Sequence, residues 1–526
     1  MVEHVLAKDE TGVRFSLPAL FKMAQSHPQI NIDISKIPTD VLFVVQTLKN
    51  KGFEAYLVGG CVRDLIIGRE VKDWDITTNA TPEQIIPLFS KTVYENNFGT
   101  VMVIKEGENE AEKGSVIAEI TPYRLETTYS DKRHPDAVTF SQNVEDDLKR
   151  RDFTINAMAY CPLLNELIDL YNGQQDLKDK IIRAVGDPNT RFEEDALRLL
   201  RAVRFSTVLN FAIESDTLSA IIKNASLIKN ISNERIRDEF TKIIMSDSPM
   251  IGIGLLEKVG LLKYIIPELE EGIGCEQGGA HIFDVFEHLV QALGHAALKK
   301  WPLEVRLAAL FHDIGKPRSR RLAPSLLGKA PSKKYTFYGH EVIGARMTQK
   351  IMERLKFPNK VTDLVVTLVR QHMFFSDTET ITLSAVRRVV AKVGKENIWT
   401  LMDIRECDRV GMKKKEAPYR LRKYHAMIEE VLRDPISVSQ LKVDGNILMN
   451  ELNIKPSPRM GWILNSLLEE VLDDPLKNPR DYLDKRVGEL DKLSDSDLKA
   501  LGEKAKETKE ELEEEEIAKL HKKHGV

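Results

Sequence analysis

The stretch LVGGCVRDLIIGREVKDWDIT, residues 57–77, decides the fold of the first part of this chain. Its apolar start is typical of a short buried strand, and Gly59 and Gly60 then form a turn into a helix. Asp73 and Asp75 lie two residues apart on a second expected strand. With a period of two, their carboxylates share one face while their neighbours point into the core.

This arrangement suits phosphate and metal chemistry. Backbone N–H groups and the positive helix end at Gly60 can face an anion, and Arg63, one turn into the helix, adds a forked donor for phosphate. Carboxylates on one face are costly unless cations neutralise them. A pair of Mg²⁺ ions that activates a hydroxyl and clamps a triphosphate needs such a pair, so we expect Asp73 and Asp75 to be catalytic. The alternative is a turn with two solvated aspartates.

The surrounding pattern predicts an α+β fold. From Val41 to about Leu170, strand-like and helix-like segments alternate, which predicts a mixed α/β head. Glu119, on an expected strand, is the candidate for a third catalytic carboxylate, and the alternative is an ordinary exposed glutamate. Beyond Asp176, apolar residues recur at three- and four-residue spacing, so nearly all of the remaining chain is expected to be helical.

Composition limits the class of protein. The chain has 526 residues, 42% of them hydrophobic and 30% charged, which is typical of a soluble protein of three or four domains. It has no apolar run long enough for a membrane span, and its N-terminus lacks the apolar core of a secretory signal. Four cysteines without a CxxC motif favour a reducing cytoplasm. The net charge of −4 does not demand a nucleic-acid partner, although local basic clusters permit RNA.

A second group of candidate metal ligands lies in the helical part. An apolar helix ends in His312–Asp313, where the aspartate can bridge two ions while the histidine binds one. Imidazole and carboxylate together suit Mn²⁺, Fe²⁺, Ni²⁺ or Co²⁺ as well as Mg²⁺. His281 and His288 compete for one position, and we choose His288 because it begins the more regular amphipathic helix. The full set is His288, His312, Asp313, His340, His372 and Asp408.

The segment 57–77 resembles the nucleotidyltransferase signature of the class II CCA-adding enzymes and bacterial poly(A) polymerases. The resemblance covers nearly all of the chain from about Asp40. Further segments are similar, in order, to the family's mobile loop, second motif, hinge, base-reading helix and helix-stabilising element: 124–140, 148–160, 181–192, 192–205 and 231–240. In the second motif, the resemblance implies that Arg151 contacts the triphosphate and that Asp152 and Asn156 lie near the sugar.

The expected base-reading helix has a physical rationale. Asp195 and Arg198 are three residues apart and would be neighbours on a helix. The carboxylate can accept from the base's amino group, and the guanidinium can donate to the acceptor beside it. CTP and ATP share this order of donor and acceptor, whereas UTP and GTP present the opposite order. Arg201 and Arg204 follow and could reach phosphates. The alternative is a surface salt bridge with solvated arginines.

Thinner evidence separates CCA addition from poly(A) synthesis. The segment 96–104 is similar to the CCA-adding subgroup and lacks the basic stretch of the poly(A) subgroup. The segment 441–472 resembles the tRNA-gripping body of CCA enzymes. We therefore expect addition of CCA to tRNA from CTP and ATP. Poly(A) synthesis and addition of the terminal A alone remain alternatives.

The ordered histidines and aspartates resemble the two-metal HD phosphohydrolases, which implies hydrolysis of 2′,3′-cyclic phosphates or 2′-phosphate ends. An HD hydrolase with a non-catalytic RNA-binding head is an alternative, as is a non-catalytic RNA-binding protein. The expected organisation is an extension (1–38), a nucleotidyltransferase head (39–175), a neck (176–275), an HD domain (276–412), a tRNA-binding body (413–494) and a charged helical tail (495–526).

Overall fold

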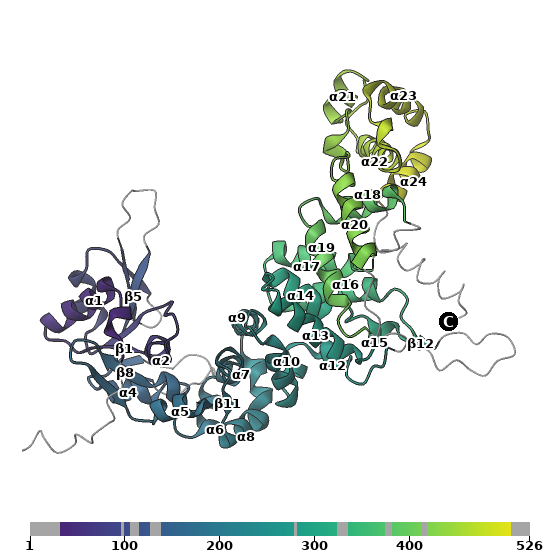
Figure 1. Ribbon diagram of the computed structural model, residues 1–526. Coiled ribbons are helices and arrows are strands. Elements are labelled where there is room, and N and C mark those ends of the chain that lie inside the picture. The colour runs from purple at the N-terminus through teal and green to yellow at the C-terminus, as the bar shows by residue number, and fades with distance from the viewer. Residues whose placement is uncertain are drawn as a thin grey trace, which may run out of the picture. The chain divides into compact units, whose positions relative to one another are not determined.

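A computed structural model describes residues 32–95, 99–105, 115–126, 138–277, 281–322, 335–373, 381–412 and 418–506. The chain divides into two compact units, and each is described by itself (Figure 1). The first, the head, ends at Leu177, and the second, the helical unit, begins at Lys178. The expected N-terminal extension up to residue 31 and the centre of the expected mobile loop, 127–137, lie outside the described residues.

The head is built on a mixed seven-stranded sheet with the order β3-β4-β5-β2-β1-β8-β9. Strands β2 and β5 pair in parallel, and the other neighbours pair antiparallel. The strands are β1 (Ala55–Val58), β2 (Asp75–Thr78), β3 (Thr92–Glu95), β4 (Thr100–Ile104), β5 (Val116–Pro122), β8 (Met158–Cys161) and β9 (Glu166–Asp169). The expected mixed head is thereby confirmed.

Short helices cover this sheet and carry residues to its edge. They are α1 (Thr39–Asn50), α2 (Gly60–Ile66), α3 (Pro82–Ile85), α4 (Val144–Lys149) and α5 (Gly173–Asp179). Helix α1 buries Val44 and Leu48 and contacts β1 and β5, because its apolar residues repeat at helical spacing. A separate antiparallel pair, β6 (Arg124–Glu126) and β7 (Val138–Phe140), flanks the undescribed loop.

The second unit is helical, as expected, apart from two short ladders. These are the parallel pair β10 (Ile181–Ile182) and β11 (Ala212–Ile213) and the antiparallel pair β12 (Arg321–Leu322) and β13 (Tyr335–Thr336). Two-residue strands carry too little periodicity to be read from sequence. The helices are α6 (Pro188–Glu194), α7 (Leu197–Leu209), α8 (Ser215–Asn224), α9 (Asn233–Ile244), α10 (Pro249–Lys258), α11 (Leu262–Ile265), α12 (Pro267–Glu270), α13 (Val285–Leu298), α14 (Leu303–Phe311), α15 (Lys316–Ser319), α16 (His340–Arg354), α17 (Asn359–Gln371), α18 (Leu383–Val393), α19 (Ile398–Asp408), α20 (Pro418–Val431), α21 (Gly445–Asn450), α22 (Pro458–Asp473), α23 (Arg480–Leu490) and α24 (Asp495–Lys506).

The last described helix corrects the expected division between the body (413–494) and the charged tail (495–526). Helix α24 packs against α22, and its Leu498 is fully buried in a core that also holds Leu467 and Leu490. The start of the charged tail therefore belongs to the packed body, because one leucine in a charged run is enough to dock a short helix. The acidic run at 510–516 lies outside the described residues. No described helix combines the length and apolar character that crossing a bilayer requires.

Candidate functional site

The predicted carboxylates of the head come together at the start of two parallel strands. Asp75 is the first residue of β2 and pairs in register with Glu119 of β5. The backbone N–H of Glu119 donates to the Trp74 carbonyl at 2.9 Å, which fixes the two strand ends beside each other. Strand β2 begins at Asp75, so Asp73 lies just before the strand on which it was expected. Trp74 and Ile76 are buried, whereas Asp75 is half-buried and Asp73 is exposed.

The electrostatics of Asp75 are those of a carboxylate in a crowded anionic site. Burial raises the pKa of Asp75 to about 6; Arg151 opposes this rise, and Glu119 and Asp73 add to it. A carboxylate pushed toward protonation by neighbouring carboxylates gains most from a bound cation. Carboxylate oxygens are also the donors that Mg²⁺ prefers, so the chemistry of these three residues fits a divalent cation. Their oxygens are not drawn together within 4.8 Å as those of the helical unit are.

Gly59 permits a close approach between Asp75 and Arg151. Its backbone has a φ of 79°, in the left-handed region that favours glycine. A Cβ at this position would lie 3.0 Å from Arg151 Nη1 and 3.7 Å from Asp75 Oδ2. A side chain here would therefore press against the Arg151 guanidinium, whereas its distance from Asp75 would be that of an ordinary contact. Helix α2 begins directly after this turn at Gly60.

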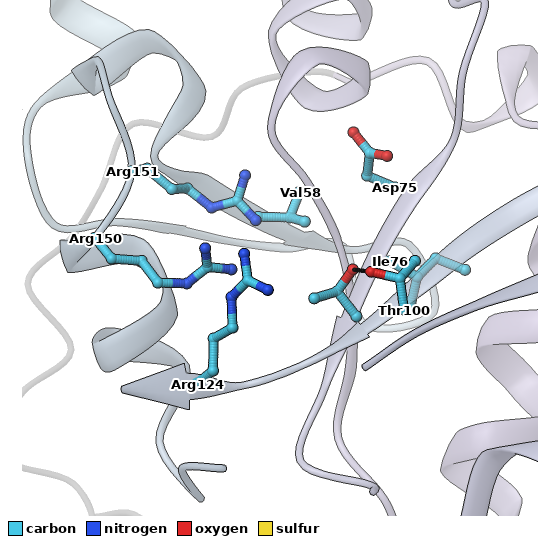
Figure 2. A pocket seen from close by; sticks show the side chains of 8 residues that line it. Val58, Asp75, Ile76, Thr100, Arg124, Arg150 and Arg151 are labelled. Atoms are coloured by element: carbon cyan, nitrogen blue, oxygen red, sulfur yellow. Dashed lines mark hydrogen bonds between the residues drawn. The ribbon is translucent and has the colours of Figure 1, made fainter. Parts of the chain in front are cut away.

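A cleft opens beside these groups. Figure 2 shows Asp75 on one side and Arg124, Arg150 and Arg151 on the other. Of these arginines, only Arg151 was predicted from the sequence. Arg150 is its immediate neighbour, whereas Arg124 reaches the cleft from β6, a long-range placement that no local pattern encodes. The lining residues are Val58, Asp75, Ile76, Thr100, Thr121, Arg124, Arg150 and Arg151.

Three other predicted residues of the head form one hydrogen-bonded chain. Arg63 donates to Asn156 Oδ1 at 2.8 Å, and Asn156 Nδ2 donates to Asp152 Oδ1 at 3.1 Å. Arg63 also donates twice to Asp64, at 2.9 Å in each case. All three members of the chain are buried. The structure thus joins the turn after β1 to the second motif, with Arg63 oriented by protein partners.

The expected base-reading pair does not lie on one helix, which corrects that part of the expectation. Asp195 ends α6 with extended backbone, and α7 begins at Leu197. The Asp195 carboxylate accepts the Leu197 N–H at 3.0 Å, as a residue that caps a helix N-terminus does. It also accepts from both terminal nitrogens of Arg235 on α9, at 2.8 and 3.3 Å. The break follows from this capping interaction.

The arginines of α7 contact other acids. Arg198 Nη1 donates to Glu194 at 2.7 Å and to the Arg191 carbonyl at 3.0 Å. Arg204 Nε lies 2.7 Å from the buried Glu239 carboxylate of α9, and Arg201 Nη1 lies 3.9 Å from it. Asp195 and Arg198 are thus each held by a separate partner. These contacts fix where α7 presents its polar face.

In the helical unit, the structure brings all six predicted HD residues together, and all are buried. Two groups have ligand atoms within 4.8 Å of one another: His288, His312, Asp313 and Asp408, and Asp313, His340 and His372. They come from separate elements, since His288 lies in α13, His340 begins α16 and Asp408 ends α19. His312 and His372 follow the last residues of α14 and α17.

The aspartate common to both groups connects them through different oxygens. Asp313 Oδ2 lies 3.4 Å from Nε2 of both His288 and His312. Asp313 Oδ1 lies 3.2 Å from His340 Nε2 and 3.5 Å from His372 Nε2. Burial alone would raise the pKa of Asp313, but Lys316 and His312 outweigh it, so its pKa lies well below the usual range.

Backbone contacts orient the four histidines alike. The Nδ1 atoms of His288, His312, His340 and His372 lie 2.7–3.1 Å from the carbonyls of Val410, Ala309, Phe337 and Val369. An Nδ1–H that donates to a carbonyl leaves Nε2 as a lone-pair donor, which is the metal-binding tautomer. Every Nε2 faces the shared Asp313. The donor set therefore fits two divalent cations bridged by one carboxylate.

His281, the competitor of His288, lies beside this cluster but belongs to neither group of ligands. Its ring centroid is 5.4 Å from that of His288. Burial lowers the pKa of His281 to about 4, with Lys316 and His288 adding to the effect. The choice of His288 agrees with the geometry.

Comparisons with known proteins match both parts of the chain that hold these residues. Three family models match: the poly A polymerase head domain at residues 55–183, the probable RNA and SrmB-binding site of polymerase A at 210–273, and the HD domain at 281–413. The chain is 34% identical over 467 residues to a CCA-adding enzyme of Lactobacillus helveticus. This alignment covers 88% of this chain and 100% of that protein.

Two further relatives extend this similarity. A CCA-adding enzyme of Limosilactobacillus reuteri is 33% identical over 456 residues, or 85% of this chain and 96% of that protein. A crystal structure of the Bacillus stearothermophilus CCA-adding enzyme in complex with CTP aligns with a TM-score of 0.62 and 27% identity. That alignment covers 86% of this chain and 97% of that structure.

Proposed function

The chain belongs to the family of CCA-adding enzymes, and we propose that it adds C, C and A to the 3′ end of tRNA from CTP and ATP. The observation that carries this proposal is the register of Asp75 with Glu119 beside the glycine turn that admits Arg151. It places two carboxylates side by side on neighbouring strands and brings a guanidinium next to the same glycine turn. We infer a cytoplasmic location, where tRNA is matured.

Each group of the head has a role in this reaction. Asp73, Asp75 and Glu119 hold Mg²⁺, which when bound activates the tRNA 3′-hydroxyl and neutralises charge on the triphosphate. Arg151 binds the triphosphate beside Gly59. Backbone N–H groups at the start of α2, from Gly60 onward, bind the same triphosphate. The hydrogen-bonded series of Arg63, Asn156 and Asp152 orients the sugar of the incoming nucleotide.

Base choice belongs to the start of α7. Asp195 accepts from the amino group that cytosine and adenine share, and Arg198 donates to the neighbouring acceptor. Arg235 and Glu194 hold these two side chains, so the pair reads the base with little loss of side-chain entropy on binding. We assign Arg201 and Arg204, farther along α7, to contacts with substrate phosphates.

The HD cluster is a second, hydrolytic site. His288, His312, Asp313 and Asp408 bind one divalent cation, and Asp313, His340 and His372 bind another, with Ni²⁺, Mn²⁺, Co²⁺, Fe²⁺ or Mg²⁺ as the candidates. The bound pair supplies a nucleophile at neutral pH for phosphoester hydrolysis. Its substrates are 2′,3′-cyclic phosphates and 2′-phosphates at damaged tRNA ends. The cyclic phosphate blocks the 3′-hydroxyl that the head extends; water that opens the P–O3′ bond frees this hydroxyl and leaves a 2′-phosphate, which a second hydrolysis removes.

Two assays test these assignments. tRNA that ends at its discriminator base is incubated with the protein, Mg²⁺ and CTP or ATP, and extension is followed on a sequencing gel. Separately, tRNA that ends in a 2′,3′-cyclic phosphate is incubated with the protein and Ni²⁺ or Mn²⁺, and phosphate release is measured. Failure of the first assay rejects the head assignment, and failure of the second rejects the hydrolytic one.

A further inference from the structure

Asp147, in the last turn of α4, is a fully buried carboxylate that contacts two adjacent arginines. Its Oδ1 accepts from Arg150 Nε at 3.0 Å and from Arg150 Nη2 at 2.5 Å. Its Oδ2 accepts from Arg151 Nε at 3.3 Å and from Arg151 Nη2 at 2.9 Å. Each oxygen therefore serves one guanidinium, and the carboxylate fixes both arginines through the same edge.

Stability alone is a poor explanation for this buried charge. Burial by itself would raise the pKa of Asp147, but Arg151 and Arg150 outweigh it and hold the pKa below its usual range. A carboxylate that remains ionised without water incurs a large desolvation cost, and replacing a whole buried ion cluster by well-packed apolar residues is often neutral or stabilising. The arrangement is therefore understandable if the orientation of the arginines matters.

That orientation points into the head cleft. Because Asp147 binds the Nε–Nη2 edge of Arg151, Nη1 is left to lie over Gly59, 3.0 Å from where a Cβ would be. Arg150 and Arg151 both line the cleft that Asp75 faces (Figure 2). Helix α4 also contacts β2, the strand that Asp75 begins. Asp147 thus links the position of the two arginines to the strand that carries the carboxylate.

We propose that Asp147 is a positioning residue for nucleotidyl transfer, which fixes Arg150 and Arg151 as one rigid unit for the triphosphate of the incoming nucleotide. This inference rests on the proposed function of the head, in which Arg151 binds the triphosphate. Asp147 touches no reacting atom and acts only through its partners. Removing Asp147 and removing Arg151 must therefore have overlapping rather than independent effects.

The test is a double-mutant cycle on the full-length protein with Asp147→Asn, Arg151→Ala and their combination. Steady-state CTP addition to tRNA gives KM for CTP, KM for tRNA and kcat, and thermal denaturation confirms folding. We expect Asp147→Asn to raise KM for CTP about tenfold or more and to leave KM for tRNA unchanged. The double variant should be less impaired than the product of the two single effects, because Asp147 then acts only through Arg150. Glu145→Gln, an exposed acid on the same helix, is the matched control and should behave as wild type.

Three results would overturn the inference. Wild-type KM for CTP in Asp147→Asn would show that the arginines need no anchor. Effects that multiply in the double variant would show that Asp147 does not act through Arg151. A wild-type KM in Arg151→Ala would reject the triphosphate contact and the inference with it. If Asp147→Asn does not fold, Arg150→Gln replaces it, and an unchanged KM for CTP would then reject the paired unit.

Discussion

Asp75 and Glu119 lie directly opposite each other in register on the parallel strands β2 and β5. Parallel strands start at the same edge of a sheet, so two carboxylates that are far apart in sequence meet at one end. Asp73, two residues before Asp75, adds a third. The polymerase chemistry that we assign to the head depends on this meeting point.

Replacing Asp75 by Asn should abolish nucleotide addition without unfolding the head. The amide keeps the shape of the side chain but removes the charge that holds the metal, so the rate should fall by several orders of magnitude. Single-turnover CTP addition measures the loss, and a tRNA-binding assay serves as the control, with near wild-type affinity expected. Asp73→Asn should behave in the same way. Retention of more than about a tenth of the wild-type activity would contradict the assignment. A tenfold fall in rate corresponds to only about 1.4 kcal/mol of activation free energy.

The raised pKa of Asp75 predicts how the stability of the metal-free protein depends on pH. Its folded-state pKa is raised from 3.8 to about 6, so folding favours the protonated form, and stability is lost as pH rises through this window. Partial exposure limits the effect to about 1–3 kcal/mol. Melting curves with EDTA should show wild type losing stability relative to Asp75→Asn between these values. Above pH 6, added Mg²⁺ should restore the lost stability of the wild-type protein and should not change the stability of Asp75→Asn. Parallel pH curves for both proteins would show that folding does not raise the pKa of Asp75.

Local patterns revealed the head carboxylates and the HD histidines because their spacing is short or their order is distinctive. The two-residue step from Asp73 to Asp75 is strand geometry, and His312–Asp313 marks a helix end. The break at Asp195 could not be read in this way. The segment 192–205 has continuous helical periodicity, which hides the local contact between the Asp195 carboxylate and the Leu197 N–H. The contact of Arg235 with Asp195 depends on tertiary structure. Arg124 in the cleft and Leu498 in the body core are also products of long-range packing.

Asp195 and Arg198 should determine which nucleotides are accepted. Asp195→Ala and Arg198→Ala should raise incorporation of UTP or GTP relative to CTP and ATP, at about 1–3 kcal/mol of discrimination per lost contact. Competition assays with mixed nucleotides measure the ratio. Arg235→Met, which releases Asp195 without removing it, should have a weaker effect in the same direction. A uniform fall in rate with unchanged selectivity would show that the pair is structural.

The HD site should be separable from the polymerase. Replacing His312 and Asp313 together by Ala removes the bridging carboxylate and one imidazole. Hydrolysis of 2′,3′-cyclic phosphate ends should stop, and CCA addition should continue at a rate near that of wild type. Elemental analysis after reconstitution should show about two fewer transition-metal ions per chain in the double variant than in the wild-type protein. Loss of both activities together with thermal stability would mean that these residues support the fold of the helical unit. A wild-type protein that binds no metal would mean that the HD site is a relic.

Sequencing of the 3′ ends made by the wild-type protein tests the central claim most directly. The substrate is tRNA that ends at its discriminator base, incubated with all four nucleoside triphosphates and Mg²⁺. We predict that nearly every extended end reads C, C, A and then stops. Tails of A without limit would identify a poly(A) polymerase, and A added only to tRNA that already ends in two cytidines would identify an A-adding enzyme. Either result would contradict the assignment of complete CCA addition to this protein.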